Sequence, residues 1–474
     1  MKYRLFIPLI GTALLAACAV GPDYQKPEVT APAQWAEQTD GDWAIAQPQD
    51  QQAKGPWWEI FADPALNQLE DQALRGSFTL QTALARLEQA RALLGIAESG
   101  RSPSADISLR SARTQTSSNR PTATGTGEAV ASLQNDHILG LGVAYELDLF
   151  GRVRRDVEAS SAGLEQAKAD LENVRLILAA DVATAYFALR TQEADIALLK
   201  QSLDLQEKAL VIVQKRVEFG AAGTADLAQQ TQLISNTRSQ LQLSLRTQAQ
   251  QQHALATLLG IQANDFHLES RTTESQTSVQ SPEIPSVLPS QLLQRRPDIA
   301  SAERAVANAN AQIGLAKSAW FPSLRISATD GLESRQWANL LDAPSAIWSI
   351  GLGLSQTVFD GGRTRARVEQ ASAGHRLATA NYRQTVLKAF QEVEDGLSSR
   401  RTLALASQEA QRAVDAASKW DGITEQRYRL GASTALEHFT SQQNRLTSQR
   451  LFQQLEGQRW ANMVFLIKAL GGQW

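Results

Sequence analysis

The sequence contains few of the residues from which most catalytic, metal and nucleic-acid sites are built. Its 474 residues include one cysteine, two methionines and five histidines, and its formal net charge is -3. A single cysteine cannot form an intrachain disulfide, and two methionines are too few for a relay of copper(I) ligands. The charge provides no basic surface to hold nucleic acid, so we exclude nucleic acid as a partner.

Sequence motifs of the common enzyme classes are also absent. The chain has no GxxxxGK[ST] loop for phosphate, no HExxH zinc site, and no GxSxG or SxxK nucleophile. Its GxG triplets, at Gly125, Gly140 and Gly351, lack the third glycine and the strand-to-helix setting of a dinucleotide-binding loop. These absences predict a protein that is not an enzyme and that uses no metal and no dissociable cofactor.

The first residues predict export from the cytoplasm. Lys2 and Arg4 precede a short apolar run, so residues 1–17 are interpreted as a signal peptide, too short to span a bilayer as a helix. The sequence LAAC, which ends at Cys18, resembles the bacterial lipobox; the resemblance implies that Cys18 becomes the mature N-terminus and carries lipid, palmitate included. The alternative is a cysteine that merely falls within a signal peptide. Ala19, where Asp would favour retention in the inner membrane, points to the outer membrane.

A period of two marks residues 138–152, ILGLGVAYELDLFGR. Large apolar residues such as Leu139 and Leu141 alternate with glycine, alanine or an acidic residue. This pattern is typical of a strand with lipid on one face and water on the other. It returns in residues 347–363, IWSIGLGLSQTVFDGGR. Beyond the signal peptide no apolar run reaches about 18 residues, so no transmembrane helix is predicted.

Long helices are predicted after each pair of strands. Residues 151–219 contain no proline, and apolar residues recur at every seventh position from Val182 to Val217, which is coiled-coil spacing. At 1.5 Å per residue such a helix is roughly 100 Å long, too long for one compact domain. A glycine-containing turn then precedes a returning helix in each half. The predicted strands and long helices are strands 104–112, 138–150, 323–330 and 347–359 and helices 151–219, 224–259, 362–430 and 435–470.

The chain is an internal duplication. Pro103 matches Pro322, and Gly220 matches Gly431, with a two-residue insertion at Asp360 to Gly362 in the second copy. The correspondence covers nearly everything after residue 80. We predict that the first repeat opens with one helix from Asp63, as N-cap, to about Ser99. The predicted domains are the signal peptide (1–17), an extended arm and equatorial segment (18–62), the first repeat (63–261), an equatorial connector (262–289) and the second repeat (290–474).

Four membrane strands per chain predict an oligomer. Four strands cannot close a barrel, and an open sheet edge in lipid leaves unpaired backbone groups that cost several kcal/mol each. Three copies in a ring supply twelve strands, within the range of outer-membrane barrels. Two copies would form a narrow eight-stranded barrel filled with side chains, whereas the glycine and serine of the polar face suit a wider, watery lumen. The long helices would continue below the membrane as a helical tube.

Several separate motifs resemble those of one protein family. VGPDY after the lipobox, WWEIFADPAL, LLQRRPDI, YELDLFGR and the duplicated Arg-x-x-x-Gly turn are similar to those of TolC-like outer-membrane factors of the lipoprotein (NodT-type) branch. The resemblance covers the whole mature chain. It implies a mixed α and membrane-β fold, with a homotrimeric 12-stranded β-barrel in the outer membrane that continues into a long periplasmic α-helical barrel. It also implies docking to a periplasmic adaptor protein and to an inner-membrane transporter.

The turns between the paired long helices are candidate docking sites. Glycine permits the tight helix reversal, and small residues leave a flat tip against which a partner helix can lie. Ordinary turn chemistry would explain the glycines without any partner, and adaptor docking is what the family resemblance implies. The predicted adaptor-contacting residues are Gly220, Ala221, Gly223, Thr224, Gly431, Ala432, Ser433 and Thr434.

The resemblance further implies a gate at the periplasmic end. Glu437, with Leu436 beside it, matches a position where family members often carry an acid, and three copies would place three carboxylates around one neck and attract cations. Asp226 holds the equivalent place in the first repeat and is a candidate latch to Tyr428 or to an arginine of the neighbouring hairpin. The alternative for both acids is a solvated carboxylate at a helix start. We interpret His438 as an ordinary histidine on a helix surface.

The sequence therefore predicts a passive outer-membrane channel of a tripartite efflux system, most simply one with an RND-type pump, that exports small molecules. Energy must come from a partner, because no nucleotide-binding motif is present. The alternatives are a type I secretion conduit, which the lipobox disfavours, a lipid-anchored periplasmic coiled-coil scaffold without transport, and a secreted hydrolase. A scaffold would not need strands with a lipid-facing apolar side, and a hydrolase would need a catalytic site.

Overall fold

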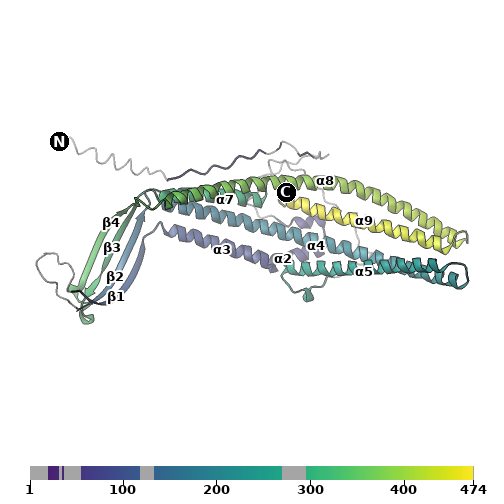
Figure 1. The fold of residues 1–474 in the computed structure, drawn as a ribbon, viewed down its shortest axis with the longest axis horizontal. Coiled ribbons are helices and arrows are strands. Elements are labelled where there is room, and N and C mark those ends of the chain that lie inside the picture. The colour runs from purple at the N-terminus through teal and green to yellow at the C-terminus, as the bar shows by residue number, and fades with distance from the viewer. Residues whose placement is uncertain are drawn as a thin grey trace. The chain divides into compact units, whose positions relative to one another are not determined.

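A computed structural model gives the fold and describes residues 20–30, 32, 35, 36, 55–117, 133–268 and 295–472. The predicted signal peptide and Cys18 lie outside these residues, as do most of the arm, the middle of the first hairpin loop and most of the connector. The elements, drawn in Figure 1, are η1 (Trp57–Phe61), α2 (Pro64–Gly76), α3 (Phe78–Ser99), β1 (Ser104–Gln115), β2 (Leu133–Leu147), α4 (Arg152–Glu218), α5 (Thr224–Leu259), η2 (Ala263–Asp265), α7 (Pro297–Ser318), β3 (Ser323–Ser334), η4 (Trp337–Asn339), η5 (Ala343–Ser345), β4 (Ala346–Ser355), α8 (Arg363–Arg429) and α9 (Ala435–Ala469).

The four strands form one antiparallel sheet in the order β1-β2-β3-β4. The register places Ile107 of β1 opposite Leu141 of β2, and Tyr145 of β2 opposite Ile326 of β3. Ile326 in turn lies opposite Leu352 of β4. Because side chains alternate between the two faces of a strand, this register collects most of the large apolar residues of the four strands on one face, which also carries Asp330 of β3. The predicted alternation is therefore carried through the whole sheet.

Two strands end earlier than predicted. The prediction of strand 138–150 is wrong at its end, because β2 stops at Leu147 and the carboxylate of Asp148 accepts hydrogen bonds from the backbone N–H groups of Val153 and Arg154 at 2.9 and 2.8 Å. Asp148 thus caps the start of α4. Likewise β4 ends at Ser355 rather than at residue 359, and Asp360 caps α8 by accepting from Thr364 N–H at 2.8 Å.

The strands also differ from prediction at their opposite ends. β1 and β3 run on to Gln115 and Ser334, a few residues past the predicted 112 and 330. β2 begins at Leu133 rather than at 138, because residues 133–137 continue the pairing with β1. Residues 113–115 and 133–136, which we predicted to lie in the loop of the first hairpin, therefore belong to β1 and β2, and residues 331–334 belong to β3.

The predicted single helix from Asp63 to Ser99 is wrong at Ser77. Asp63 caps α2 as expected and accepts from Ala65 N–H at 3.1 Å, but Ser77 has extended backbone angles that separate α2 from α3. A Cβ atom at Gly76 would lie 2.4 Å from the carbonyl oxygen of Leu259, and one at Gly260 would lie 2.1 Å from that of Gly76. The end of α5 therefore approaches this break closely, and only glycine fits at either position.

The described chain divides into two compact units. Unit 1 comprises Met1–Glu28, Leu87–Ala167 and Ala302–Tyr382, and unit 2 comprises Val29–Arg86, Lys168–Ser301 and Arg383–Trp474. Unit 1 contains the sheet and the helix segments next to it. Unit 2 contains the helical hairpins. Helices α3, α4, α7 and α8 each run from one unit into the other.

Buried aromatic residues hold unit 2 together beside η1. Phe61 lies with its ring centroid 4.9 Å from that of Phe187, which stacks on Trp460 at 5.4 Å. The hydroxyl group of Tyr186 donates to the helix-capping carboxylate of Asp63 at 2.6 Å. The residues of the WWEIFADPAL motif are therefore core and cap residues that dock η1 and α2 on α4 and α9.

Arg296 explains the LLQRRPDI motif in structural terms. Its guanidinium group donates to the carboxylates of Glu392 on α8 and Asp298 on α7, both at 2.7 Å, and to the carbonyl oxygen of Ala469 at 3.0 Å. Burial alone would lower the pKa of Arg296, but the bonds to the two carboxylates raise it, so the group stays charged. Arg296 thus fixes the start of α7 to the end of the second hairpin.

Candidate functional site

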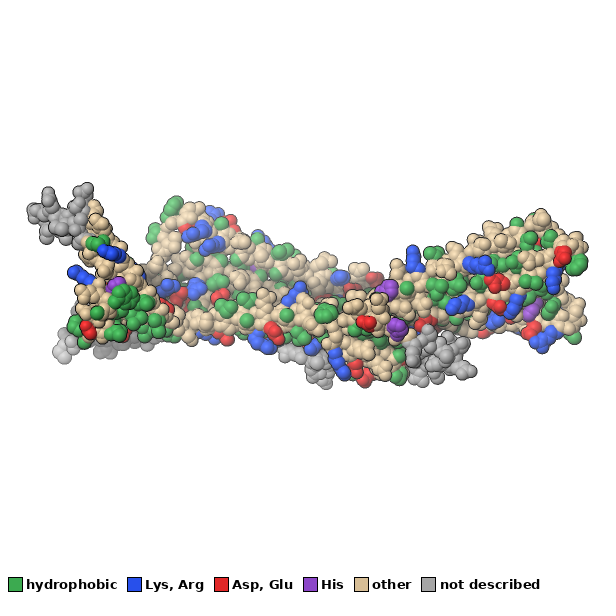
Figure 2. Space-filling view, turned by 90° about the horizontal axis from the view of Figure 1, so that it is seen from below, with side chains coloured by type: hydrophobic (Ala, Val, Ile, Leu, Met, Phe, Trp, Pro, Cys, Tyr) green, Lys and Arg blue, Asp and Glu red, His purple; other side chains and the backbone are tan. Residues whose placement is uncertain are grey.

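The outer face of the sheet is the first candidate site. Its apolar side chains are unusually exposed in a single chain, with exposed fractions of 78% for Ile107, 78% for Trp348 and 73% for Ile350. In Figure 2 hydrophobic side chains gather over the strands, whereas polar and charged side chains are mixed among them along the helices. A water-soluble monomer rarely leaves so continuous an apolar surface uncovered. This face has the composition of a surface that contacts lipid.

The opposite face of the sheet is polar and lined by small residues. Gly140 lies opposite Ser108 and Gly331, and Ser327 lies opposite Gly351. The hydroxyl groups of Thr329 and Ser349 hydrogen-bond to each other at 2.7 Å on this side. Small and hydroxylated side chains leave space for water next to the sheet, so this face suits the lumen of an aqueous channel.

The two hairpin tips have the same hydrogen-bonded geometry. Gly220 and Gly431 have φ angles of 71° and 72°, the left-handed region that favours glycine. In the first tip Arg216 donates to Ala221 O at 3.2 Å, and in the second Arg427 donates to the carbonyl oxygen of the equivalent alanine at 3.3 Å. The duplication therefore extends to individual hydrogen bonds.

The predicted docking residues lie exposed or half-buried at these tips. The structure brings Gly220, Ala221, Gly223 and Thr224 together at one tip and Gly431, Ala432, Ser433 and Thr434 at the other. Two neighbours that the sequence analysis missed, Phe219 and Leu430, are 81% and 83% exposed at equivalent places. Their signal was visible in the sequence, since each is a large apolar residue directly before a turn glycine.

Glu437 is a helix-capping residue in this chain. Its carboxylate accepts hydrogen bonds from the hydroxyl group of Ser433 and from Thr434 N–H, and its own N–H donates to Thr434 Oγ1 at 3.2 Å. The hydrogen bond from Ser433 lowers the pKa of Glu437, so the carboxylate stays ionised at neutral pH. Leu436 beside it is 39% exposed. The solvated helix-start position that we considered as the alternative is what the single chain contains.

Asp226 has the same role in the first hairpin. Its carboxylate accepts from Gly223 N–H at 3.0 Å, at the start of α5. Tyr428 lies in the other hairpin, where its ring stacks on that of His438 with centroids 5.6 Å apart. Within the described chain Asp226 and Tyr428 make no hydrogen bond with each other, and the latch between neighbouring hairpins stays a prediction.

His438 is not the ordinary surface histidine that we expected. Only 13% of its side chain is exposed, and its Nδ1 atom lies 3.7 Å from the carboxylate of Asp421 on α8. The same carboxylate accepts from Arg445 Nε at 2.9 Å and from Ser441 Oγ at 3.0 Å. This cluster ties α8 to α9 near the tip. Sequence periodicity missed it because the partners come from two antiparallel helices.

A second buried ion pair joins the two hairpins. Asp195 on α4 accepts from Arg450 Nε on α9 at 2.9 Å and from the hydroxyl group of Ser244 on α5 at 3.2 Å. Gln443 on α9 also donates to Ser202 Oγ on α4 at 3.3 Å. Arg450 donates in addition to Gln240 Oε1 on α5 at 3.4 Å, so α9 is bonded to both long helices of the first repeat.

The N-terminal arm is fixed next to the sheet by Arg155, which the sequence analysis also missed. This side chain is 4% exposed and donates to the carbonyl oxygens of Val20 and Gly21 and to Asp23. Val20 N–H donates to Phe150 O at 3.2 Å, three residues after the end of β2. A Cβ atom at Gly314 would lie 2.8 Å from Val20 O, so α7 packs directly against the backbone of the arm.

Among the residues that the structure describes, no group of three or more histidine, cysteine, aspartate or glutamate residues is arranged to hold a metal ion. None of the helices in the part of the chain that the structure describes combines the length and the hydropathy needed to cross a bilayer.

Comparisons with known proteins agree with this geometry. A family model described as outer membrane efflux protein matches residues 69–261 and 288–472. The solvent efflux pump outer membrane protein SrpC of Pseudomonas putida is 32% identical over 482 residues, which cover 100% of this chain and 99% of that protein. Outer membrane protein OprJ of Pseudomonas aeruginosa is 29% identical over 462 residues, which cover 97% and 94%.

Solved structures show the same fold. The outer-membrane channel OprN superimposes with a TM-score of 0.83 at 28% sequence identity, over 96% of this chain and 100% of that chain. The open state of the Neisseria gonorrhoeae MtrE outer membrane channel gives a TM-score of 0.81 at 27% identity, over 96% and 98%.

Proposed function

We propose that three copies of this chain, which belongs to the outer membrane efflux protein family, form one passive export duct. The chain is the outer-membrane channel component of a tripartite efflux system, and the predicted localisation to the outer membrane is confirmed. The predicted fold class, that of a TolC-like channel with four strands and long helical hairpins per chain, is also confirmed. The trimer and the passive mechanism are our inferences from these facts.

The observation that carries the proposal is the four-stranded sheet itself. It has one mainly apolar face, one polar face rich in small residues, and two edges, β1 and β4, that no strand of the described chain covers. Unpaired edge groups cost several kcal/mol each in lipid, so neighbouring copies must cover them. Three sheets joined edge to edge give twelve strands, enough to enclose water rather than side chains.

We assign the two hairpin tips to the adaptor. Phe219 and Leu430 extend apolar side chains beside turns whose small residues leave the backbone accessible. An amphipathic helix from a periplasmic adaptor can bury both groups, which favours its association with the tips. An inner-membrane transporter then supplies the energy, and the duct itself carries out no enzymatic reaction and uses no cofactor other than lipid on the chain.

The arm supports lipidation of Cys18. Val20, two residues later, is bonded to Phe150 just past the end of β2, which is the membrane boundary in this proposal. A lipid attached to Cys18 would therefore start at the level of the bilayer surface. This placement fits the lipobox resemblance, and Arg155 supplies the contacts that hold the arm there.

Small molecules are the proposed cargo. The relatives SrpC and TtgI are named for efflux of solvent and toluene, and ArpC for efflux of antibiotics. By this likeness we favour export of small molecules over type I secretion of proteins. The polar lumen face imposes no obvious chemical selection, so we place the choice of substrate in the transporter.

Glu437→Ala in planar bilayers tests both the duct and its gate. We expect the purified wild-type protein to conduct ions without nucleotide and to prefer cations. The variant should show higher conductance, because the cap at the start of α9 is lost, and weaker cation preference, because three carboxylates leave the neck. Single-channel current with unequal salt on the two sides measures both quantities.

Glu425→Ala is the matched control, since Glu425 is an exposed acid on α8 that pairs with Arg429 within its own helix. It should leave conductance unchanged. Bilayers that stay silent with every protein would contradict the duct. Equal conductance and selectivity in wild type and in Glu437→Ala would remove Glu437 from the gate but leave the duct intact.

A further inference from the structure

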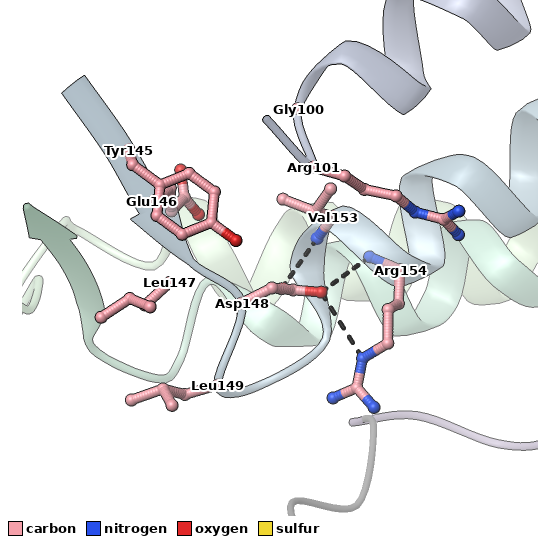
Figure 3. A pocket seen from close by; sticks show the side chains of 9 residues that line it. All are labelled: Gly100, Arg101, Tyr145, Glu146, Leu147, Asp148, Leu149, Val153 and Arg154. Carbon is pink, nitrogen blue, oxygen red and sulfur yellow. Dashed lines mark hydrogen bonds and ion pairs between the residues drawn. The ribbon is translucent and has the colours of Figure 1, made fainter. Parts of the chain in front are cut away.

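A pocket of about 480 Å³ lies in unit 1 where the sheet meets the helices, and we call it the rim pocket. Figure 3 shows its walls, which come from the turn between α3 and β1, from the end of β2 and from the start of α4. The lining residues used below are Arg101, Tyr145, Leu147, Asp148, Leu149 and Arg154.

The rim pocket has one apolar side and one basic side. Leu147 and Leu149 lie together on the side of the strands, with the ring of Tyr145 above them (Figure 3). The guanidinium groups of Arg101 and Arg154 lie on the side of the helices. Tyr145 and Leu147 belong to the apolar face of the sheet, because they lie opposite Ile326 and Leu324 in the register. The pocket therefore continues the surface that contacts lipid.

The charges in the pocket leave one cation without a partner. Asp148 accepts from two backbone N–H groups and lies 3.5 Å from Arg154 Nε. Glu146 is paired with Arg152 at 2.7 Å. Arg101, in contrast, is exposed, and its side chain makes no hydrogen bond or ion pair with the described residues. Only its backbone N–H is bonded, to the carbonyl oxygen of Glu98 at 2.9 Å. The balance thus favours an anionic ligand over a cationic one.

A hydroxyl donor completes the site. The side chain of Tyr145 is directed toward the middle of the pocket in Figure 3, and within the described ranges its hydroxyl group has no hydrogen-bond partner. An arginine and a hydroxyl donor beside an apolar wall match the parts of a glycerophospholipid, with its phosphate, its ester-linked glycerol and its acyl chains.

We propose that the rim pocket binds one phospholipid of the periplasmic leaflet, with the phosphate at Arg101 and the acyl chains along Leu147 and Leu149. The proposal rests on the placement of the sheet in the outer membrane. Tyr145 donates to the phosphate or to an ester oxygen, and Arg154 stays paired with Asp148. The bound lipid fixes the height of the strand-to-helix junction in the bilayer.

Native mass spectrometry of the detergent-purified protein, titrated with dioleoyl phosphatidylglycerol, tests the site. We expect one lipid per chain to stay bound without a covalent bond, which separates it by mass from lipid attached to Cys18. Arg101→Gln should weaken binding about tenfold, because a charge-assisted bond is lost. Tyr145→Phe should weaken it about threefold through loss of a neutral hydrogen bond.

Arg91→Gln is the charge-matched control, because Arg91 is an exposed arginine of the same unit on α3, outside the pocket. It should bind lipid as the wild type does. Lipid binding unchanged in both Arg101→Gln and Tyr145→Phe would overturn the proposal. So would equal retention of inorganic phosphate, which would indicate an anion site, or loss of the oligomer in Arg101→Gln, which would indicate a subunit contact. Bilayer conductance of the same preparations reports separately on the duct.

Discussion

Replacing Glu70 with glutamine should raise the free energy of unfolding at pH 7 by about 3 kcal/mol. The side chain of Glu70 on α2 is fully buried, and neither of its carboxyl oxygens has a hydrogen-bond partner in the described part of the chain. Burial, with a smaller contribution from the charge of Asp71, raises the pKa of Glu70 to about 9 from an ordinary value of 4.5. The folded protein therefore keeps this carboxyl group protonated at neutral pH.

The sign of the effect follows from proton linkage. Between pH 4.5 and about 9 the unfolded chain ionises Glu70 whereas the folded chain does not, so folding must take up a proton. Below pH 4.5 Glu70 takes no free energy of unfolding from the wild type. Between pH 4.5 and about 9 the free energy of unfolding falls by about 1.4 kcal/mol for each pH unit. Glutamine is neutral in both states and removes this loss.

Thermal unfolding in detergent at pH 5 and pH 8 measures the difference. Glu70→Gln should be markedly more stable than the wild type at pH 8 and nearly equal to it at pH 5. Glu88→Gln on α3 is the control, because Glu88 is an exposed acid and does not contribute to the raised pKa of Glu70. A variant that is destabilised at both pH values would show that the buried carboxyl group is needed as an acid.

Asp195→Ala should lower the free energy of unfolding by roughly 3 kcal/mol. Asp195 and Arg450 have side chains that are 9% and 25% exposed, and removal of one partner leaves the other charge in a poorly hydrated place. Ser244 also loses its acceptor. Because these bonds join α4 to α5 and α9, the loss should loosen the two hairpins from each other. Urea unfolding monitored by circular dichroism reports the change.

Asp204→Ala provides the matched comparison on the same helix. Asp204 pairs with Lys208 at 2.6 Å, but both side chains are more than half exposed, so the pair contributes less than about 1 kcal/mol. Equal effects of the two substitutions would contradict a role of the Asp195–Arg450 pair in joining the hairpins.

The sequence predicted the repeating features of the fold and missed those that depend on one local contact. Alternation in residues 138–147 and 347–355 identified the strands, because each strand has one apolar face. The end of β2 was misplaced because Asp148 turns back to cap α4, and no periodicity encodes that bond. The break at Ser77 was missed for a similar reason, since it depends on the close approach of Gly76 and Gly260.

The residues of the candidate site likewise fall into two groups, those that local sequence patterns predict and those that depend on distant partners. Turn glycines and the acids that follow them were identifiable from the chain, and they lie at the tips as local chemistry requires. Arg155, Asp195 and Asp421 were not identifiable, because each acts through partners that lie more than 20 residues away in the sequence or on another helix. Gating by Glu437 or Asp226 requires neighbouring copies and stays a prediction.

The number of chains in the detergent-extracted channel tests the central claim most directly. Native mass spectrometry of the intact complex should give a mass of three chains, with sheet signal retained in circular dichroism, since three four-stranded sheets close one barrel. A single chain that keeps its sheet, or a stable pair, would contradict a shared duct.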